Sequence, residues 1–347
     1  MNLSYRTRRF LQGLGIFFIV LVLLAVVAWL IWLIWLDRFV VYTRDGVKID
    51  FSLSSQQLSG EVAKPPEENH TIDIYFNEGE NEMVTSTELE KLTGYYADVA
   101  SLEREFDLVL QQVSLLPPEA PVMLDVKDIR GNFLYTTSVG NYQSSAVSAS
   151  QMDSLIAHLR ATGAYMIARL PAFKDYRYGL DNVPYGLHHS SNRYLYMDED
   201  RCYWLDPNSE GTMSYLMRIV SELKGLGFDE VVFDYFWYPD TKDLAYKGDR
   251  EASIAKAAQR LVENCATETF AISFVGLEPD FTLPEGRTRL YLTNRSASNA
   301  ATLAKETKIE EDIEIKLVFV TDVNDTRFDA YGALRPITAA RLDEEEE

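Results

Sequence analysis

Short apolar runs alternate along most of the chain with longer segments in which apolar residues recur every three or four positions. The short runs predict strands buried on both faces, and the longer pattern predicts amphipathic helices. Gly163 and Gly227 lie just beyond two helical segments, where glycine commonly ends a helix. The helical pattern covers 102–113, 152–159, 213–223 and 254–262. Strands are expected at 94–98, 122–126, 165–170, 230–233, 270–275, 289–292, 315–320 and 330–334.

This alternation predicts parallel strands joined by right-handed crossovers. Eight such units within about 250 residues would close into a (β/α)8 TIM barrel, the α/β fold that we expect over residues 91–340. An open doubly wound sheet is the alternative, but no glycine-rich phosphate loop follows the first expected strand. The segment 176–203 is long, aromatic and without periodicity, which indicates an extended loop over one face of the barrel.

Residues 15–36 form an unbroken apolar run without a charged side chain. As a helix this run would extend roughly 33 Å, enough to cross a bilayer core of about 30 Å. A cleavable signal peptide would have a shorter apolar region, whereas here Trp29, Trp32 and Trp35 occupy the far end, as in an interfacial aromatic belt. We therefore expect an uncleaved transmembrane signal-anchor helix over residues 10–36.

The flanking charges predict the orientation of this helix. Arg6, Arg8 and Arg9 crowd the short N-terminal side, so residues 1–9 are expected to stay in the cytoplasm. Long domains translocate largely regardless of their charge. The rest of the chain is therefore expected to be extracytoplasmic, held at the cell membrane by a single pass.

Residues 37–90 are expected to form a stalk between membrane and barrel. Short strands at 39–42 and 47–51 flank the turn-forming sequence Arg44-Asp45-Gly46, which predicts a hairpin. A linker rich in Ser, Gln and Pro follows at 52–69, and one more strand is expected at 71–76. The acidic tail at 341–347 is expected to be solvated, because like charges repel.

The composition limits the classes of function. Asp and Glu (53) outnumber Lys and Arg (33), and the net charge of −20 argues against a nucleic-acid partner. A hydrophobic fraction of 47% excludes disorder for most of the chain. Two cysteines cannot form a disulfide scaffold, although Cys202 and Cys265 could pair. With four histidines, and none at ligand spacing with an acid or cysteine, we expect neither a metal nor another cofactor.

Ligands of a TIM barrel bind at the carboxyl ends of its strands, so the polar residues that close each apolar run are the candidates for chemistry. Seven of the eight expected strands end in such residues. In strand order they are Asp98; Asp125, Lys127 and Asp128; Arg169, Lys174 and Asp175; Asp234; Glu278; Asn294 and Arg295; and Asp322.

Asp234 is the most distinctive of these residues, because it directly follows an apolar strand and precedes Tyr235 and Trp237. Aromatic rings stack on the apolar faces of sugars, and a carboxylate stabilises positive charge at the anomeric carbon. The pattern therefore favours a carbohydrate site. The structural alternative is a strand-end aspartate that caps the next helix or pairs with a base.

Glycoside hydrolysis commonly takes two carboxylates. We expect Asp234 to act as nucleophile or charge stabiliser, with Glu278 or Asp125 as the general acid. Asp322 also follows a later strand and would contact the substrate. The simpler alternatives are that Glu278 is a surface loop acid and that Lys127 neutralises Asp125.

Three sequence blocks carry a family resemblance. They are 122–128 (VMLDVKD) with Gly131 and Tyr135 beyond, 163–175 with Ile167-Ala168-Arg169, and 204–207 (WLDP) with 227–235 and Pro239. These blocks resemble a bacterial family of glycoside hydrolase-like proteins, predicted TIM barrels distantly similar to α-amylase-type enzymes. Beyond the fifth strand the chain departs from that family, which has a Met–Tyr–Pro–Ser stretch where residues 291–296 stand. The resemblance implies a substrate cleft formed by Asp125, Lys127, Arg169, Asp206 and Asp234.

These observations predict a membrane-anchored, extracytoplasmic glycoside hydrolase-like protein. Its expected partner is a carbohydrate, either a polysaccharide or a cell-envelope glycan, on which Tyr235 and Trp237 would stack. The alternative is a catalytically inactive barrel that binds a glycan or serves as an envelope scaffold.

Overall fold

The computed structural model describes residues 40–43, 46–49 and 89–338. The chain divides into two compact units, Met1–Asn81 and Glu82–Glu347. In the first unit, β1 (Val40–Thr43) and β2 (Gly46–Ile49) pair antiparallel, with Thr43 opposite Gly46. This pairing confirms the predicted hairpin.

Several predictions for the two ends of the chain lie outside the described residues. They are the transmembrane helix at 10–36, the linker at 52–69, the strand at 71–76 and the tail at 341–347. Within the described ranges, no helix combines the length and the apolar character needed to cross a bilayer.

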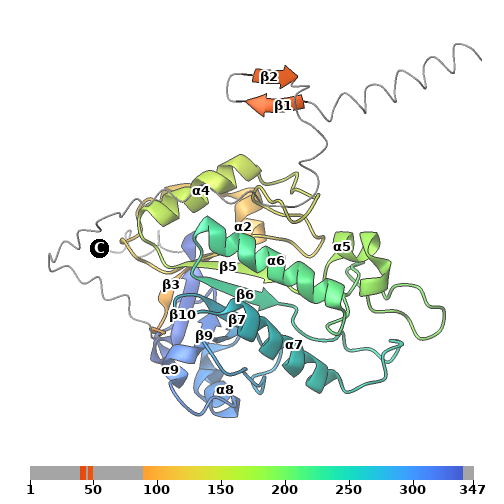
Figure 1. Ribbon diagram of the computed structural model, residues 1–347. Helices are drawn as coiled ribbons and strands as arrows, with labels where there is room; N and C mark the ends of the chain where they lie inside the picture. Colours follow the sequence, from red (N-terminus) through yellow and green to blue (C-terminus); the bar gives the residue numbers. More distant parts are fainter. Residues whose placement is uncertain (1–39, 44–45, 50–88, 339–347) are drawn as a thin grey trace, which may run out of the picture. The chain divides into compact units, whose positions relative to one another are not determined.

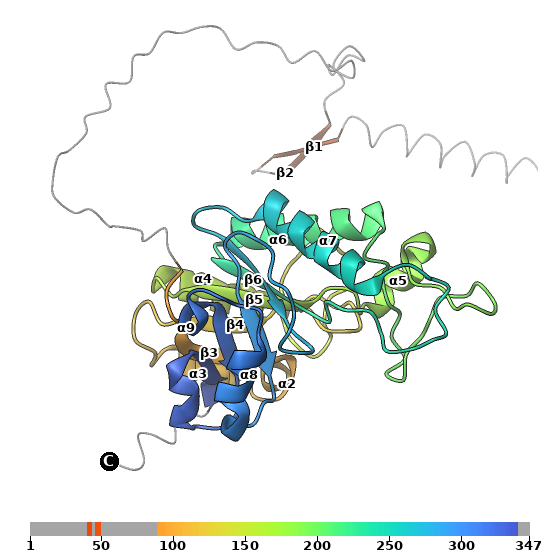
Figure 2. The same ribbon diagram turned by 90° about the horizontal axis from the view of Figure 1, so that it is seen from below.

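The second unit is a closed barrel of eight parallel strands (Figures 1 and 2). Neighbouring strands follow in chain order, and β10 closes the barrel against β3. The eight predicted strands are confirmed, each within two residues at both ends. The strands are β3 (Thr93–Ala97), β4 (Val122–Asp125), β5 (Met166–Pro171), β6 (Glu230–Asp234), β7 (Ala271–Val275), β8 (Leu290–Thr293), β9 (Leu317–Val320) and β10 (Gly332–Pro336).

Helices cover the outside of the barrel less regularly than the predicted (β/α)8 pattern. Within residues 89–338, no helix follows β7, and β9 is followed only by the 3-10 turn η4 (Thr326–Ala330). The other helical segments are α2 (Val99–Arg104), α3 (Phe106–Val113), α4 (Ala149–Ala161), α5 (Tyr176–Asp181), η2 (Val183–Tyr185), α6 (Glu210–Leu226), α7 (Arg250–Cys265), η3 (Ala297–Asn299), α8 (Ala300–Glu306) and α9 (Ile313–Lys316).

The helix predicted over 102–113 is divided in two at Glu105. The backbone of Glu105 leaves the helical region (φ −135°, ψ 33°), and its N–H bonds to the carbonyl of Ser101 to close α2. Apolar periodicity continues across the break, which is why the sequence pattern did not show it. By contrast, α6 ends as predicted at Gly227, whose φ of 99° suits glycine.

The core has two shells, as expected for strands buried on both faces. One shell lies between the strands and the helices and includes Leu124, Ala168 and Val231. The other fills the barrel interior with side chains from alternate strand positions, among them Ile167 and Val232. The interior of the barrel is therefore filled with side chains rather than hollow.

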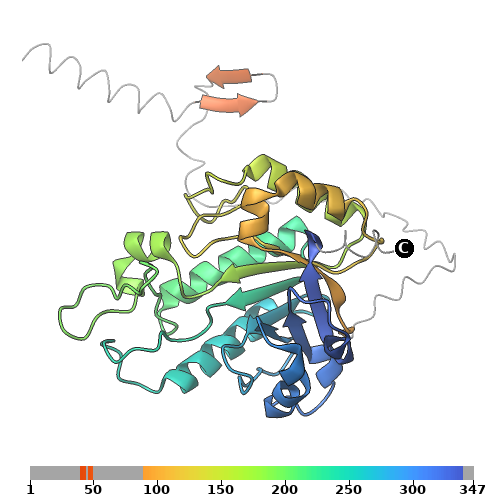
Figure 3. The same ribbon diagram turned by 180° about the vertical axis from the view of Figure 1, so that it is seen from behind.

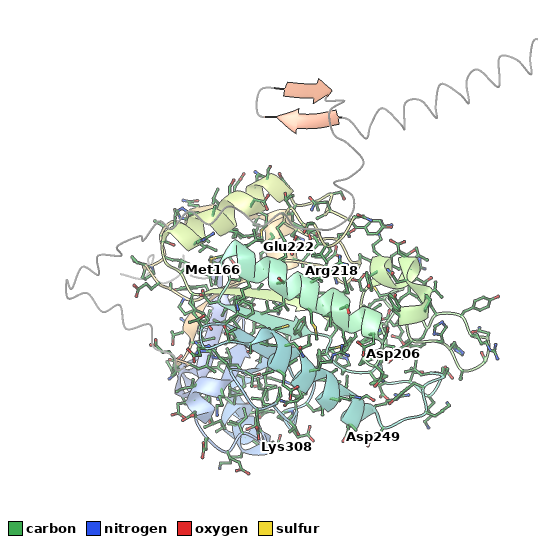
Figure 4. The ribbon with its side chains drawn as sticks, in the orientation of Figure 1. Met166, Asp206, Arg218, Glu222, Asp249 and Lys308 are labelled. Carbon is green, nitrogen blue, oxygen red and sulfur yellow. The ribbon has the colours of Figure 1, made fainter. Side chains whose placement is uncertain are left out.

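A loop after β4 is fastened to the outside of the barrel by one carboxylate. Glu222 on α6 accepts hydrogen bonds from the hydroxyls of Tyr135 (2.8 Å) and Thr137 (2.5 Å) and from the Ser138 N–H (2.6 Å) (Figure 4). One helical turn away, Arg218 donates to the carbonyl of Val139 (2.8 Å). These bonds fix the path of the chain between β4 and α4.

The loops after β5 and β6 extend beyond the carboxyl ends of these strands (Figures 1 and 3). The predicted long loop at 176–203 is present, but it contains α5 and η2. It pairs with the loop after β6 through a bridge between His189 and Leu244. The two loops therefore form one continuous structure beside the mouth of the barrel.

Candidate active site

A cavity of about 260 Å³ opens at the carboxyl ends of β4, β5 and β6. This is the end at which barrel enzymes bind their ligands. The structure brings five of the predicted site residues together in its wall. They are Asp125, Lys127, Arg169, Asp234 and Tyr235.

Asp125 and Arg169 form a bidentate ion pair in this wall. Strand register places the two residues opposite each other on β4 and β5. Arg169 Nε and Nη2 donate to the two Asp125 carboxylate oxygens at 2.6 and 2.9 Å, and the Val99 N–H adds a third bond at 2.9 Å. Burial disfavours the charged guanidinium, but the neighbouring Asp125 raises the pKa of Arg169. The pair is thus a fixed, internally neutralised group.

Asp234 is the last residue of β6 and lies on the same cavity. Within the described part of the chain, its carboxylate receives one hydrogen bond, from the N–H of Tyr235 at 2.7 Å. Burial raises the pKa of Asp234 above the ordinary value, although the positive charge of Arg169 opposes the rise. A carboxyl group with few partners and a raised pKa is suited to proton transfer.

Tyr235 follows in a conformation that non-glycine residues rarely adopt, with a φ of 50°. Its ring centroid lies 5.3 Å from that of Trp237, and the Lys174 ammonium lies 5.0 Å from the Tyr235 ring centroid. Lys174 is itself fixed by ion pairs to Asp198 (2.8 Å) and Asp200 (2.5 Å). Backbone strain of this kind concentrates at functional sites, where surrounding contacts maintain it.

Lys127 belongs to the cavity wall, but its ammonium group faces the protein interior. Its Nζ lies 2.7 Å from an Asp175 oxygen, and neither side chain is exposed. Asp175 also accepts hydrogen bonds from the Tyr178 N–H (2.8 Å) and the Tyr215 hydroxyl (3.1 Å). Gly131, part of the resemblance block, is required here because a Cβ would lie 2.2 Å from Asp175 Oδ1.

Trp237 and Glu278 line a second, larger cavity of about 550 Å³. It lies between the loop after β6, the first turns of α7 and the loop after β7. Asp249 and Lys308, both labelled in Figure 4, are among its lining residues. Glu278 is exposed to solvent. The structure therefore places Glu278 and Asp234 in different cavities.

Asp206 and Asp322 line neither cavity. One Asp206 oxygen accepts hydrogen bonds from the Asn208 backbone N–H (2.9 Å) and side-chain amide (3.1 Å). That amide also donates to the hydroxyl of Tyr238 (2.9 Å), so Asp206 is linked through Asn208 to a residue that lines the second cavity. Asp322 is exposed, two residues beyond β9.

Tyr96, which the sequence reasoning did not single out, lines neither cavity, but its pKa is influenced by the charges of Arg169 and Asp125 in the first cavity wall. It lies on β3, in contact with the barrel-interior cluster. Burial, and then the negative charges of Asp98 and Asp322, raise the pKa of its hydroxyl to about 12. The sequence could have indicated Tyr96 through the alternation of side chains along β3, in which every second residue faces the barrel interior. Asp98, one of the strand-end acids, instead caps α2 by accepting from the Ser101 N–H (2.8 Å).

The two cysteines are free thiols, so the pairing considered from the sequence is absent. Cys202 is buried, and burial raises the pKa of its thiol to about 11. Among residues 89–338 and the hairpin, no group of three or more His, Cys, Asp or Glu side chains is arranged to hold a metal ion.

A family model described as "Putative glycosyl hydrolase domain" matches residues 97–272. The matched segment includes the whole wall of the first cavity and stops before Glu278. The comparison with curated proteins gives no match.

The chain is similar to several solved structures at low sequence identity. A hypothetical protein from Ruminiclostridium thermocellum is 20% identical, with 52% of this chain and 96% of that chain covered and a TM-score of 0.44. An alpha-galactosidase from Thermus thermophilus in complex with stachyose is 14% identical, with 74% and 65% covered and a TM-score of 0.49.

Proposed function

We propose that this chain, which belongs to the family described as "Putative glycosyl hydrolase domain", is a glycosidase acting on a polysaccharide or cell-envelope glycan. The proposal rests on the position and the raised pKa of Asp234. This carboxyl group lies at the carboxyl end of a barrel strand, faces a cavity, and has a raised pKa. Such a group is what acid–base cleavage of a glycosidic bond requires.

The role of Asp234 follows from its environment. From the sequence alone we expected a nucleophile or charge stabiliser. The raised pKa instead favours the general acid, because it increases the fraction of the carboxyl group that carries a proton to donate to the leaving glycosidic oxygen. As the bond from the anomeric carbon to that oxygen breaks, a water molecule would add to the anomeric carbon, forming the new C–O bond and completing hydrolysis.

A non-catalytic glycan-binding barrel is the second candidate, and one observation favours it. Both oxygens of Asp125 are occupied by Arg169, and Glu278 lies in the other cavity. The third carboxylate that lines the first cavity, Asp128, accepts hydrogen bonds from the Asn132 backbone N–H and side-chain amide, both at 2.8 Å. Among the described cavity carboxylates, Asp234 is thus the one whose only hydrogen bond comes from its own backbone neighbour. Binding without cleavage is the expected result if no second carboxylate or base activates water there.

We also propose that the chain is anchored in the cell membrane by residues 10–36, with residues 1–9 in the cytoplasm. The apolar run and the three N-terminal arginines support this orientation. Protease added to intact cells should then degrade the barrel. Protection of residues 40–347 under these conditions would contradict the orientation.

The two candidate functions are separated by assaying the full-length chain in detergent against a panel of polysaccharides and oligosaccharides. A hydrolase should release products, and Asp234→Asn should abolish release while retaining binding. Asp240→Asn, at an exposed position in the same loop, is the matched control and should behave as the wild type. A glycan-binding protein should bind without releasing products. Turnover that survives Asp234→Asn would eliminate the catalytic proposal.

A further inference from the structure

The loop after β6 forms a wall shared by the two cavities. Tyr235 lines the first cavity, and the next three residues, Phe236, Trp237 and Tyr238, line the second. The rings of Tyr235 and Trp237 are in contact, with centroids 5.3 Å apart, and both side chains are partly exposed. An aromatic surface therefore continues from the cavity of Asp234 into the larger one.

The remaining walls of the second cavity suit a sugar chain. Leu277 and Phe281 provide apolar surface, and Leu277 is 51% exposed. Glu251 and Glu278 are exposed carboxylates on opposite sides, on α7 and on the loop after β7. Sugars present apolar ring faces to aromatic side chains and hydroxyl donors to carboxylates, and both kinds of group are available here.

The charges around this cavity exclude an anionic chain. Its lining has four carboxylates and two cations. Arg250 is committed to the carbonyls of Pro239 (3.2 Å) and Thr241 (2.7 Å), and Lys308 lies 3.8 Å from Asp280. A uronic acid or phosphate group would meet uncompensated negative charge, whereas an uncharged glycan would not.

We infer that the second cavity is a binding subsite for further sugar units of an uncharged glycan whose reacting linkage lies at Asp234. This inference rests on the proposed function. Its consequence is a dependence on chain length, because only a ligand longer than the first cavity can reach the aromatic surface beyond Trp237. The larger cavity has about twice the volume of the first, so it can hold more of a long ligand than the first cavity can.

The test measures the affinity of the full-length chain in detergent for malto-, cello- and N-acetylchito-oligosaccharides, from the monosaccharide to the hexasaccharide. Ala255→Trp fills the second cavity from an exposed position on α7, and Thr282→Trp fills it from the opposite wall. The matched control is Lys256→Trp, the exposed neighbour that does not line the cavity.

Affinity of the wild type should rise with length in one of these series, and each blocking variant should lower the affinity for the longest member by about tenfold. Affinity for the shortest member should stay unchanged, and Lys256→Trp should match the wild type. Length-independent binding in the wild type, or full affinity in both blocking variants, would overturn the subsite while leaving the proposed function intact. Equal length dependence for oligogalacturonates would overturn the preference for an uncharged chain. If the protein binds no glycan of any length, both the subsite and the proposed function are contradicted.

Discussion

Each end of the barrel interior carries a buried or partly buried carboxylate–arginine ion pair, but the two ends differ in how completely their charged groups are paired. At the amino end of the strands, Glu230 and Arg289 form an ion pair of 2.5 Å, with side chains 0% and 1% exposed. Tyr165 and Tyr291 donate their hydroxyls to the same carboxylate at 3.0 and 2.9 Å. Arg289 uses its remaining nitrogens on the carbonyls of residues 90 and 315. Every charged atom of this amino-end cluster has a partner.

At the carboxyl end, the pairing is incomplete. Asp125 and Arg169 satisfy each other, but Asp234 beside them has a single hydrogen bond, from the backbone of Tyr235. A buried charge without partners costs stability, so a protein keeps such a group where it serves another purpose. The comparison indicates that the amino end is built for stability and the carboxyl end for binding and chemistry.

The largest expected effect comes from breaking the amino-end cluster. Glu230→Gln leaves the Arg289 guanidinium buried without a counter-charge and should lower the free energy of unfolding by about 3–5 kcal/mol. Urea denaturation of the full-length chain measures this value. The matched control is Glu210→Gln, which breaks an exposed glutamate–arginine pair with Arg260 and should leave the denaturation midpoint unchanged. Equal effects of the two substitutions would refute the assignment of the amino end to stability.

The second prediction concerns Lys127, which lies at the carboxyl end but is paired like the amino-end cluster. Lys127→Met leaves Asp175 buried and unpaired and should cost about 3 kcal/mol of unfolding free energy. Adding Asp175→Asn should restore part of this loss, because the uncompensated charge is then removed. If Lys127→Met instead weakened glycan binding without lowering stability, Lys127 would be a substrate-binding residue, as the sequence analysis expected.

A smaller effect is expected from Arg169, whose charge lowers the pKa of Asp234. Arg169→Gln removes this charge, so the part of the pH–turnover profile that Asp234 controls should move to higher pH by about one unit. Arg169→Lys retains the positive charge and should shift the profile less. A profile that stays in place in Arg169→Gln would show that Asp234 does not control turnover.

The sequence predicted the barrel well because strands of a parallel sheet are buried on both faces and appear as apolar runs. It also placed Asp125, Arg169 and Asp234 at strand ends, which meet at one rim in a closed barrel. It could not predict that Arg169 occupies both carboxylate oxygens of Asp125, because this pairing depends on the register of β4 against β5. Nor could it place Glu278, whose position depends on the path of an irregular loop.

The pKa of Asp234 also fixes the sign of its effect on stability. Because this pKa is raised in the folded state, the contribution to stability is largest while the carboxyl group is protonated. It is lost as the pH rises through the raised value. Asparagine is uncharged at every pH, so Asp234→Asn should be at least as stable as the wild type at neutral pH, and the two should converge in acid.

The central claim is that Asp234 lies at the end of the barrel reserved for function. Its most direct test is the rate of glycan hydrolysis by Asp234→Asn, compared with the wild type at equal folded concentration. The account predicts a fall of about a thousandfold with no loss of unfolding free energy at neutral pH. Unchanged hydrolysis, or a loss of activity that only follows a loss of stability, would contradict it.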